Sequence, residues 1–584
     1  MKTGKPDELN GAAAVCQVLL AHGVEVFFGY PGGAILPLYD VLGDYPALRH
    51  VLVRHEQGAA HAADGYARAS GRVGVCLATS GPGAANLVTG LATAMLDSVP
   101  VLAITGNVPG ALLGKDAFQE IDITGITIPC TKHNYLVRQA DDIPRVLAEA
   151  FYLAQNGRPG PVLVDITKDA LMGVCHTPLQ ATVDLPGFKP TLVGHPKQIK
   201  LAAERILQAQ RPVILAGHGV LIAEAMPQLR ELAELLQAPV VHTLLGIGAI
   251  DEQHPLSVGF VGMHGWKHAN KTIQTADLII ALGMRFDDRV TGKVETFAPG
   301  AQIIQVDIDP AEIGKNVAVD IPIVGDIQKV LVALIPNLKE GLNRLPAPAA
   351  WKANRAAHLA QIATWRAETQ KMPWHGSGAW RDGALSADFV VEKIAQAGEH
   401  RAILVADVGQ NQMWTARYGG FRYPHTHLSS GGLGTMGYSL PAAIGAALAK
   451  QGSEVWAIAG DGGLQMTMQE LMTVVQEEVP VKIAVLNNHK LGMIRQWQEL
   501  VYDGNYHSSH LLGPDWVALA QAFGIKALRV QSPQEVEAAV AQARAFNGPV
   551  LIDFEMSSEQ NIFPMMPPGV GLSDLLEENA DLEV

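Results

Sequence analysis

Short apolar runs recur along the whole 584-residue chain, and many of them end in a glycine-rich turn. Val99–Thr105 precedes Gly-Asn, Leu278–Leu282 precedes GMRFDD, and Val455–Ala459 precedes GDGG. Segments with helical periodicity, such as Leu201–Gln208 and Gln534–Phe546, lie between the runs. Apolar strands that alternate with helices are typical of parallel sheets covered on both faces. We therefore predict an α/β fold with doubly wound, mainly parallel sheets that bind ligands at the carboxyl ends of their strands. The other predicted strands are Val73–Thr79, Val162–Ile166, Val213–Ala216, Ile303–Ile308, Ile403–Val408, Val481–Leu486 and Val550–Phe554.

Two stretches interrupt the alternation of strands and helices. Residues 176–198 are rich in Pro, Thr and Gly, and residues 341–386 contain PAPAA and MPWHGSG with few strand signals. Both stretches are interpreted as linkers. They divide the chain into three predicted α/β domains and a tail, with the boundaries 9–176, 196–340, 386–560 and 561–584.

The composition excludes several classes of protein. Charged residues make up 17% of the chain and hydrophobic residues 48%, which is typical of a large globular protein rather than a disordered one. The net charge of −14 argues against nucleic acid or an anionic membrane as the main partner. No apolar run approaches the roughly 18 residues that span a bilayer, and MKTGKPDELN lacks the apolar core of a secretion signal. The four cysteines are widely spaced without a CxxC pair, so we expect buried thiols in a reducing cytoplasm.

The strongest chemical signal is a pair of motifs that follow two predicted strands. Gly460-Asp461-Gly462-Gly463 follows one strand, and Asn487-Asn488 follows the next, with Asn488 27 residues after Asp461. A carboxylate and a carboxamide are oxygen ligands suited to Mg²⁺, and glycines let the backbone approach phosphate oxygens. The pair predicts a metal that bridges a diphosphate. The alternative is an ordinary strand-to-helix turn with a capping Asp.

GDG followed at this distance by NN is the signature of thiamine-diphosphate enzymes, and the chain from about residue 10 to 575 resembles their acetohydroxyacid synthase family. The resemblance implies a pyrimidine-binding domain, a central Rossmann-like domain associated with FAD, and a diphosphate-binding domain. It implies that the cofactor lies between the first domain of one subunit and the third of another. A homodimer or homotetramer and a small regulatory subunit follow from it. The segments that carry the resemblance are FGYPGGAILPLYD (28–40), RHEQGAAHAADGYARASG (54–71), TSGPGAANLVTGLA (79–92), DAFQE (116–120), GRPGPVLVDITKD (157–169), GMRFDDRVTG (283–292), GGLGTMGYSLPAAIGA (431–446) and LNNHKLGMIRQWQ (486–498).

The family resemblance also implies a reaction. Pyruvate is decarboxylated on thiamine diphosphate, and the hydroxyethyl unit is joined to pyruvate or 2-ketobutyrate. The products are 2-acetolactate and 2-aceto-2-hydroxybutyrate, in the biosynthesis of valine, leucine and isoleucine. Mg²⁺ is expected on Asp461, Asn488 and the backbone carbonyl of Lys490, and FAD is expected to be structural. The tail is expected to close over the site.

Specific residues match the positions that hold thiamine diphosphate in the family. Glu56 would hydrogen-bond the aminopyrimidine and activate the cofactor, although a helix-capping Glu paired with Arg54 is the alternative. Met436 would bend the cofactor, although it could be a core methionine. Asn411 stands where the family has His, so it can donate a hydrogen bond to phosphate but carries no charge. The implied contacts are Tyr30, Pro31, Glu56, Val408, Gly409, Gln410, Asn411, Gly434, Met436, Gly460, Gly462, Gly463, Leu491, Gly492 and Met493.

A second group of residues matches the FAD-binding stretches of the family. Glycines at strand ends and Arg285 could hold a dinucleotide diphosphate. The alternative is a Rossmann-like spacer domain without flavin. The implied FAD contacts are Arg158, Met263, His264, Gly265, Gly283, Met284, Arg285, Asp287, Arg289, Asp307, Ile308, Gly325 and Asp326.

The resemblance also implies the substrate contacts. Arg289 would grip the carboxylate of the second keto acid, although it could instead form a surface ion pair with its acidic neighbours. Trp497 would favour 2-ketobutyrate as acceptor, a selectivity of about 1–3 kcal/mol for one methylene. Gly33, Phe118, Gln119 and Lys168 would line the access channel.

Three rival interpretations remain open at this point. A pyruvate oxidase type of enzyme would have the same fold and a working flavin, and a catabolic acetolactate synthase would have no flavin. A non-catalytic scaffold would keep the fold without the chemistry, but Glu56 and Asp461 are both present.

Overall fold

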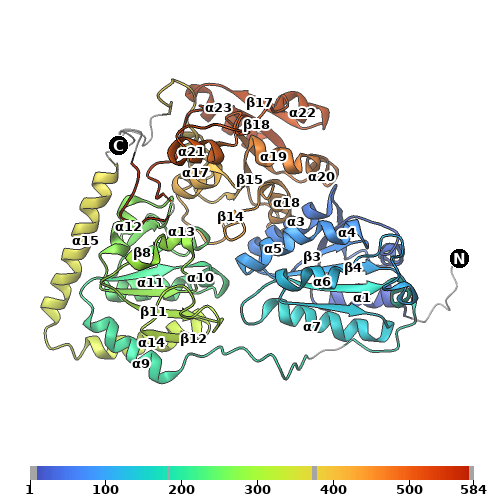
Figure 1. Cartoon of the computed structure of the whole chain (residues 1–584), viewed down its shortest axis with the longest axis horizontal. Coiled ribbons are helices and arrows are strands. Elements are labelled where there is room, and N and C mark those ends of the chain that lie inside the picture. The colour runs from blue at the N-terminus through green and yellow to red at the C-terminus, as the bar shows by residue number, and fades with distance from the viewer. Residues whose placement is uncertain (1–8, 180–182, 371–377, 568, 578–584) are drawn as a thin grey trace.

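In the computed structural model, the chain forms three parallel sheets of six strands each, and helices flank each sheet (Figure 1). The structure describes residues 9–179, 183–370, 378–567 and 569–577. The predicted fold class is confirmed, since every strand pair within these sheets is parallel.

The N-terminal sheet has the strand order β2-β1-β3-β4-β6-β5. Its central strands are apolar and fully buried, which is why the sequence pattern identified them. The strands are β1 (Val26–Gly29), β2 (Arg49–Leu52), β3 (Gly74–Ala78), β4 (Val101–Asn107), β5 (His133–Val137) and β6 (Val162–Thr167). The helices are α1 (Gly11–Ala21), α2 (Leu36–Val41), α3 (Glu56–Ser70), α4 (Pro82–Asn86), α5 (Val88–Asp97), α6 (Ile123–Thr127), α7 (Ile143–Gln155) and α8 (Lys168–Met172).

The central sheet has the order β12-β11-β10-β7-β8-β9. Its strands are β7 (Pro212–Ala216), β8 (Val240–His242), β9 (Ser257–Phe260), β10 (Leu278–Leu282), β11 (Gln302–Asp307) and β12 (Ile321–Val324). Its helices are α9 (Pro196–Gln208), α10 (His218–Ile222), α11 (Met226–Leu236), α12 (Lys267–Gln274), α13 (Asp288–Thr291), α14 (Ile327–Leu342) and α15 (Pro348–Gln370).

The C-terminal sheet repeats the strand order of the N-terminal sheet, as β14-β13-β15-β16-β18-β17. Its strands are β13 (Ile403–Ala406), β14 (His427–Ser429), β15 (Val455–Gly460), β16 (Lys482–Asn487), β17 (Lys526–Val530) and β18 (Val550–Glu555). Its helices are α16 (Ala387–Ala397), α17 (Gln410–Tyr418), α18 (Ser439–Ala449), α19 (Asp461–Thr467), α20 (Leu471–Gln476), α21 (Gly492–Val501), α22 (Trp516–Ala522) and α23 (Pro533–Ala545).

The stretch 341–386 differs from the predicted linker. It contains the 23-residue helix α15, which lies along the outside of the central sheet (Figure 1). Trp351 and Leu359 of this helix pack against the apolar core under the central sheet. Alanine-rich sequence forms helix readily, and these two apolar contacts dock it. Residues 371–377 of the same stretch lie outside the described residues.

The N-terminal and C-terminal sheets share one core through helices α3 and α18, which lie side by side (Figure 1). Glycines allow this close approach. A Cβ at Gly65 would lie 2.1 Å from the carbonyl oxygen of Ala442, and one at Gly445 would lie 1.9 Å from that of Ala62. The helices therefore pack backbone to backbone.

The tail runs along the central domain. The amide of Met566 donates to the carbonyl of Met263 (2.8 Å), and the amide of Lys293 donates to that of Val570 (2.9 Å). Residues 568 and 578–584 of the predicted tail lie outside the described residues.

Two smaller predictions concern the cysteines and membrane segments. Cys16, Cys76, Cys130 and Cys175 are buried free thiols, as expected. Within the part of the chain that the structure describes, no helix has both the length and the apolar character needed to cross a bilayer.

Candidate functional site

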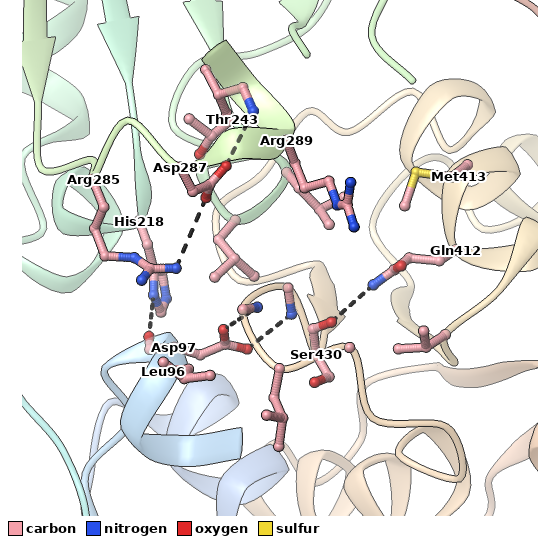
Figure 2. A pocket seen from close by; sticks show the side chains of 18 of the residues that line it. Leu96, Asp97, His218, Thr243, Arg285, Asp287, Arg289, Gln412, Met413 and Ser430 are labelled. Carbon is pink, nitrogen blue, oxygen red and sulfur yellow. Dashed lines mark hydrogen bonds and ion pairs between the residues drawn. The ribbon is translucent and has the colours of Figure 1, made fainter. Parts of the chain in front are cut away.

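A cavity of about 830 Å³ lies where the carboxyl ends of the central and C-terminal sheets face the end of helix α5. His218 follows β7, Val408 follows β13, and Gly460 ends β15, so the strand ends supply its walls. Leu96 and Asp97 line the side formed by the N-terminal domain (Figure 2). The position agrees with the rule that parallel sheets bind ligands beyond the carboxyl ends of their strands.

Asp461 and Asn488 both line this cavity. Asp461 is 2% exposed, and its Oδ2 has no hydrogen-bond partner among the described residues. Burial raises the pKa of this carboxyl to about 7. The Nδ2 of Asn488 donates to Oε1 of Gln410 (3.3 Å), while its Oδ1 accepts from the amide of Lys490 (3.1 Å). A buried carboxylate oxygen without a partner fits a cation, and these oxygens suit Mg²⁺.

The loop that carries Met436 is held against the end of β13 by Asp407. The buried carboxylate of Asp407 accepts from the amides of Gly437 and Ser439, both at 2.9 Å. It also fills the space beside Gly463, where a Cβ would lie 2.4 Å from its Oδ1. Glycine at 463 is therefore required by close packing, and Met436 projects into the cavity from a fixed turn.

Asn411 lines the cavity, but its amide is turned inward. Its Nδ2 donates to the carbonyls of Asp407 (2.9 Å) and Ile458 (3.2 Å). Since both hydrogens of this amide are used, the side-chain donation to phosphate that was expected from the sequence does not occur in this arrangement. The Oδ1 of Asn411 instead faces Gly409, where a Cβ would lie 2.8 Å away.

Arginines and acidic residues of the central domain line the other part of the cavity (Figure 2). Arg285 lies 3.9 Å from Asp287. The Arg289 side chain is 62% exposed and lies 3.6 Å from Asp288. Two cationic groups beside strand-end glycines suit a dinucleotide diphosphate or a carboxylate. The predicted FAD residues that line the cavity are Arg158, Met263, His264, Gly283, Met284, Arg285, Asp287, Arg289, Asp307, Ile308 and Asp326, whereas Gly265 and Gly325 are not among the lining residues.

Two of these residues carry little free charge toward a ligand. Arg158 pairs with Glu312 (2.8 Å) and Asp309 (3.5 Å). Burial lowers the pKa of His264 to about 3, with smaller contributions from nearby arginines, so its imidazole is neutral at pH 7. His264 can therefore accept or donate one hydrogen bond but carries no charge toward a ligand.

The remaining predicted residues divide into two groups. The predicted residues of the C-terminal domain line the cavity, and they include Lys490, Leu491, Gly492, Met493 and Trp497. On the N-terminal domain, Arg158 lines the cavity, but the residues predicted to contact thiamine diphosphate or the substrate do not line it within one chain: Tyr30, Pro31, Gly33, Glu56, Phe118, Gln119 and Lys168.

Glu56 occupies a separate part of the molecule. It is the first residue of α3 and is mostly buried, and its Oε2 accepts from Nδ2 of Asn86 (2.9 Å). Tyr30 and Phe118 on the same domain are 42% and 89% exposed. In a single chain, Glu56 is therefore buried away from the cavity, while Tyr30 and Phe118 are exposed to solvent.

Several lining residues were not predicted from the sequence. Asp97 is the most connected of them, since its carboxylate accepts from Arg68 (2.7 Å), Gly431 (3.0 Å) and Gly432 (2.6 Å). Its carbonyl accepts from Nδ1 of His218 (2.8 Å; Figure 2). Thr243 and Ser430 follow β8 and β14, which are only three residues long and give a weak sequence signal. The position of His218 after a strong strand is a signal that could have identified it.

Comparison with known proteins gives matches along nearly the whole chain. The thiamine pyrophosphate enzyme family models for the N-terminal TPP-binding domain, the central domain and the C-terminal TPP-binding domain match residues 9–126, 199–334 and 407–554. An acetolactate synthase of Mycobacterium bovis is 50% identical over 577 residues, covering 97% of this chain and 91% of the relative. An acetolactate synthase large subunit of Corynebacterium glutamicum is 47% identical, covering 98% and 91%. A probable acetolactate synthase large subunit of Methanocaldococcus jannaschii is 47% identical, covering 97% and 95%. The chain therefore belongs to the thiamine-pyrophosphate-dependent enzymes, in the acetolactate synthase (acetohydroxyacid synthase) family.

Proposed function

We propose that this chain is the catalytic subunit of an acetolactate synthase, a transferase that forms a carbon–carbon bond between two 2-keto acids. It decarboxylates pyruvate and joins the remaining two-carbon unit to pyruvate or 2-ketobutyrate. The products, 2-acetolactate and 2-aceto-2-hydroxybutyrate, lead to branched-chain amino acids. One observation carries this proposal: Asp461, with an unpartnered buried oxygen, opens into the same cavity as Arg289 and Trp497.

Thiamine diphosphate, when bound, supplies the nucleophilic carbon and the electron sink for the decarboxylation. Asp461, Asn488 and the carbonyl of Lys490 would hold Mg²⁺ against its diphosphate. The glycines at 460, 462 and 463 leave room for the phosphate oxygens. Met436, on the turn fixed by Asp407, would support the middle of the cofactor.

The second keto acid would bind between Arg289 and Trp497. The exposed guanidinium of Arg289 has room to grip a carboxylate with two hydrogen bonds. The indole of Trp497 lies against apolar residues of the central domain and offers an apolar wall for the extra methyl of 2-ketobutyrate.

Glu56 would reach the cofactor from a second copy of the chain. In one chain it lies outside the cavity, together with the other predicted residues of the N-terminal domain. In a homodimer or homotetramer, the carboxyl group of Glu56 would hydrogen-bond the aminopyrimidine ring of the cofactor held by the neighbouring subunit and favour its activation. A small regulatory subunit is also expected, since relatives are named large subunits.

FAD would bind the central domain without taking part in electron transfer. Two pyruvates give one acetolactate and CO₂, so the reaction balances without an oxidant. Arg285 and the glycines of the central strand ends fit the dinucleotide diphosphate. The four buried thiols favour a cytoplasmic location.

The proposed function is tested by incubating the purified protein with pyruvate alone and measuring acetolactate. We expect product only when thiamine diphosphate and Mg²⁺ are present, and loss of activity when FAD is stripped. The flavin absorbance should stay unchanged during turnover. Bleaching of the flavin at the catalytic rate, with acetate or acetyl phosphate as product, would instead identify an oxidase.

A further inference from the structure

Two buried side-chain amides, those of Gln410 and Gln496, connect Asn488 to the C-terminal segment, defined here as residues 556–567. Asn488 Nδ2 donates to Gln410 Oε1 (3.3 Å), and Gln410 Nε2 donates to Gln496 Oε1 (2.9 Å). Gln496 then pairs with the backbone of Ile562, accepting from its amide (2.9 Å) and donating to its carbonyl (3.0 Å). All four residues are at most 7% exposed, so water does not replace these bonds.

The backbone of the C-terminal segment fixes the direction of this relay. The Ile562 amide can only donate and its carbonyl can only accept, so the Gln496 side chain has a single orientation that satisfies both. Gln410 Nε2 also donates to the carbonyl of Gln560 (3.0 Å), which uses both of its hydrogens. Gln410 Oε1 must then face Asn488 and receive its Nδ2.

The orientation of Gln410 also fixes that of Asn488, the proposed metal ligand. With its nitrogen held by Gln410, the Asn488 carboxamide turns its Oδ1 to the opposite side, where the Lys490 amide donates to it. Rotation of the carboxamide by a half turn would present nitrogen, which does not bind Mg²⁺. Such a rotation would also place Oδ1 of Asn488 against Oε1 of Gln410, and Nδ2 of Asn488 against the amide N–H of Lys490. Both mismatches would leave buried polar groups unpaired.

We propose that Gln496 is a positioning residue: its hydrogen bonds to the backbone of the C-terminal segment fix the orientation of Gln410, and Gln410 fixes the orientation of the Asn488 carboxamide. Docking of the C-terminal segment and the affinity for a divalent cation are therefore coupled. This inference rests on the proposed function, in which Asn488 holds Mg²⁺. Coupling of this kind is reciprocal: a docked segment strengthens metal binding, and bound metal strengthens docking by the same factor.

The test compares two substitutions of Gln496 in the full-length protein. Gln496→Met keeps the length of the side chain and removes the relay. Gln496→Glu still accepts from Gln410 and from the Ile562 amide, and its second oxygen, protonated in these buried surroundings, donates to the Ile562 carbonyl. The control is Gln498→Met on the same helix, since Gln498 donates to the carbonyl of His507 and takes no part in the relay. Mg²⁺ is titrated calorimetrically into each apo protein with thiamine diphosphate at a fixed concentration.

We expect Gln496→Met to weaken Mg²⁺ binding about tenfold, the lower end for residues that orient a metal ligand. Gln496→Glu and Gln498→Met should stay within about threefold of the unaltered protein by the same criterion. Equal affinities for the unaltered protein and Gln496→Met would overturn the inference. A loss in Gln496→Glu as large as in Gln496→Met would also overturn it, because the accepting group is retained there.

Hydrogen exchange of the C-terminal segment gives a second readout that does not depend on activity. Adding Mg²⁺ and thiamine diphosphate should slow exchange at residues 560–566 in the unaltered protein and in Gln498→Met, but not in Gln496→Met. Equal protection in all three proteins would contradict the coupling. If the unaltered protein binds no Mg²⁺ with thiamine diphosphate, the proposed function itself fails, whereas normal binding with equal variants rejects only the relay.

Discussion

Two acidic side chains of the proposed site have opposite local surroundings. Asp461 keeps one buried oxygen without a partner, whereas Glu56 receives a hydrogen bond from Asn86. A bound cation would supply the partner that the Asp461 oxygen lacks. The hydrogen bond from Asn86 instead holds the Glu56 carboxylate in position. Loss of the charge should therefore have different effects at the two residues. At Asp461 it should weaken cofactor binding, and at Glu56 it should lower the turnover number.

Glu56→Gln should lower the turnover number by at least about 100-fold, the usual contribution of a positioned acid–base group. The amide oxygen of Gln can still accept from Asn86, so the melting temperature should change little. Acetolactate formation at saturating cofactor measures the effect. Full activity in this variant would remove Glu56 from the mechanism.

Asp165 gives a prediction about pH and stability. It is buried, accepts from Thr105 (2.7 Å) and Asn107 (2.5 Å), and burial raises its pKa to about 6. The folded state therefore binds more protons than the unfolded state between about pH 4 and 6, and the free energy of unfolding falls as the pH rises through this window. The difference between the two pKa values corresponds to about 3 kcal/mol.

Asp165→Asn removes this titration. Its melting temperature relative to the unaltered protein should rise steadily between about pH 4.5 and pH 7, because only the unaltered protein loses stability there. Calorimetric scans across this range provide the measurement. A difference that stays constant with pH would mean that Asp165 titrates normally.

At the scale of elements, the ten strands predicted from the sequence are adjacent to one another within each of the three sheets. β3, β4 and β6 are neighbours, as are β11, β10 and β7. Strands at the edges of the sheets were not predicted, because one of their faces meets solvent and their sequences are not continuously apolar. β2 and β5, for example, have mixed burial patterns. Others were too short to detect, such as β8 with three residues.

The same reasoning explains which site residues the sequence could reveal. Asp461 and Asn488 follow the central strands β15 and β16, so the pattern found them. The inward turn of the Asn411 amide and the relay through Gln496 depend on partners 47 and 66 positions away. Amide orientation is set by such distant partners, which local sequence does not encode.

Helices α3 and α18 give a prediction at this scale. Gly445→Ala would place a methyl group 1.9 Å from the Ala62 carbonyl oxygen, and backbone cannot yield as a side chain can. We expect a loss of about 3 kcal/mol or more in the free energy of unfolding, at the upper end for overpacking. Gly43→Ala is the control, since no atom lies within 4 Å of its added Cβ. Similar melting temperatures for the two variants would show that the helix pair can separate without cost.

At the scale of the whole molecule, one chain holds two halves of the proposed site that do not face each other. The metal set opens into the cavity, while Glu56, Tyr30 and Phe118 lie elsewhere. The tight α3–α18 contact fixes the N-terminal domain against the C-terminal domain of the same chain, so hinge motion cannot bring Glu56 to Asp461. We therefore expect a second copy of the chain to supply the missing half.

This arrangement predicts complementation between two inactive variants. Glu56→Gln and Asp461→Ala should each be inactive alone, because every site then lacks either the acid–base group or the metal ligand. When equal amounts are unfolded or dissociated together and reassembled, half of the dimers carry one chain of each kind. Each such dimer has one site built from an intact Glu56 and an intact Asp461, so about one quarter of the original activity should return. Mixing two preparations of the same variant is the control and should restore nothing. If the two halves of a site came from one chain, no mixture would recover activity, and the shared site would have to be abandoned.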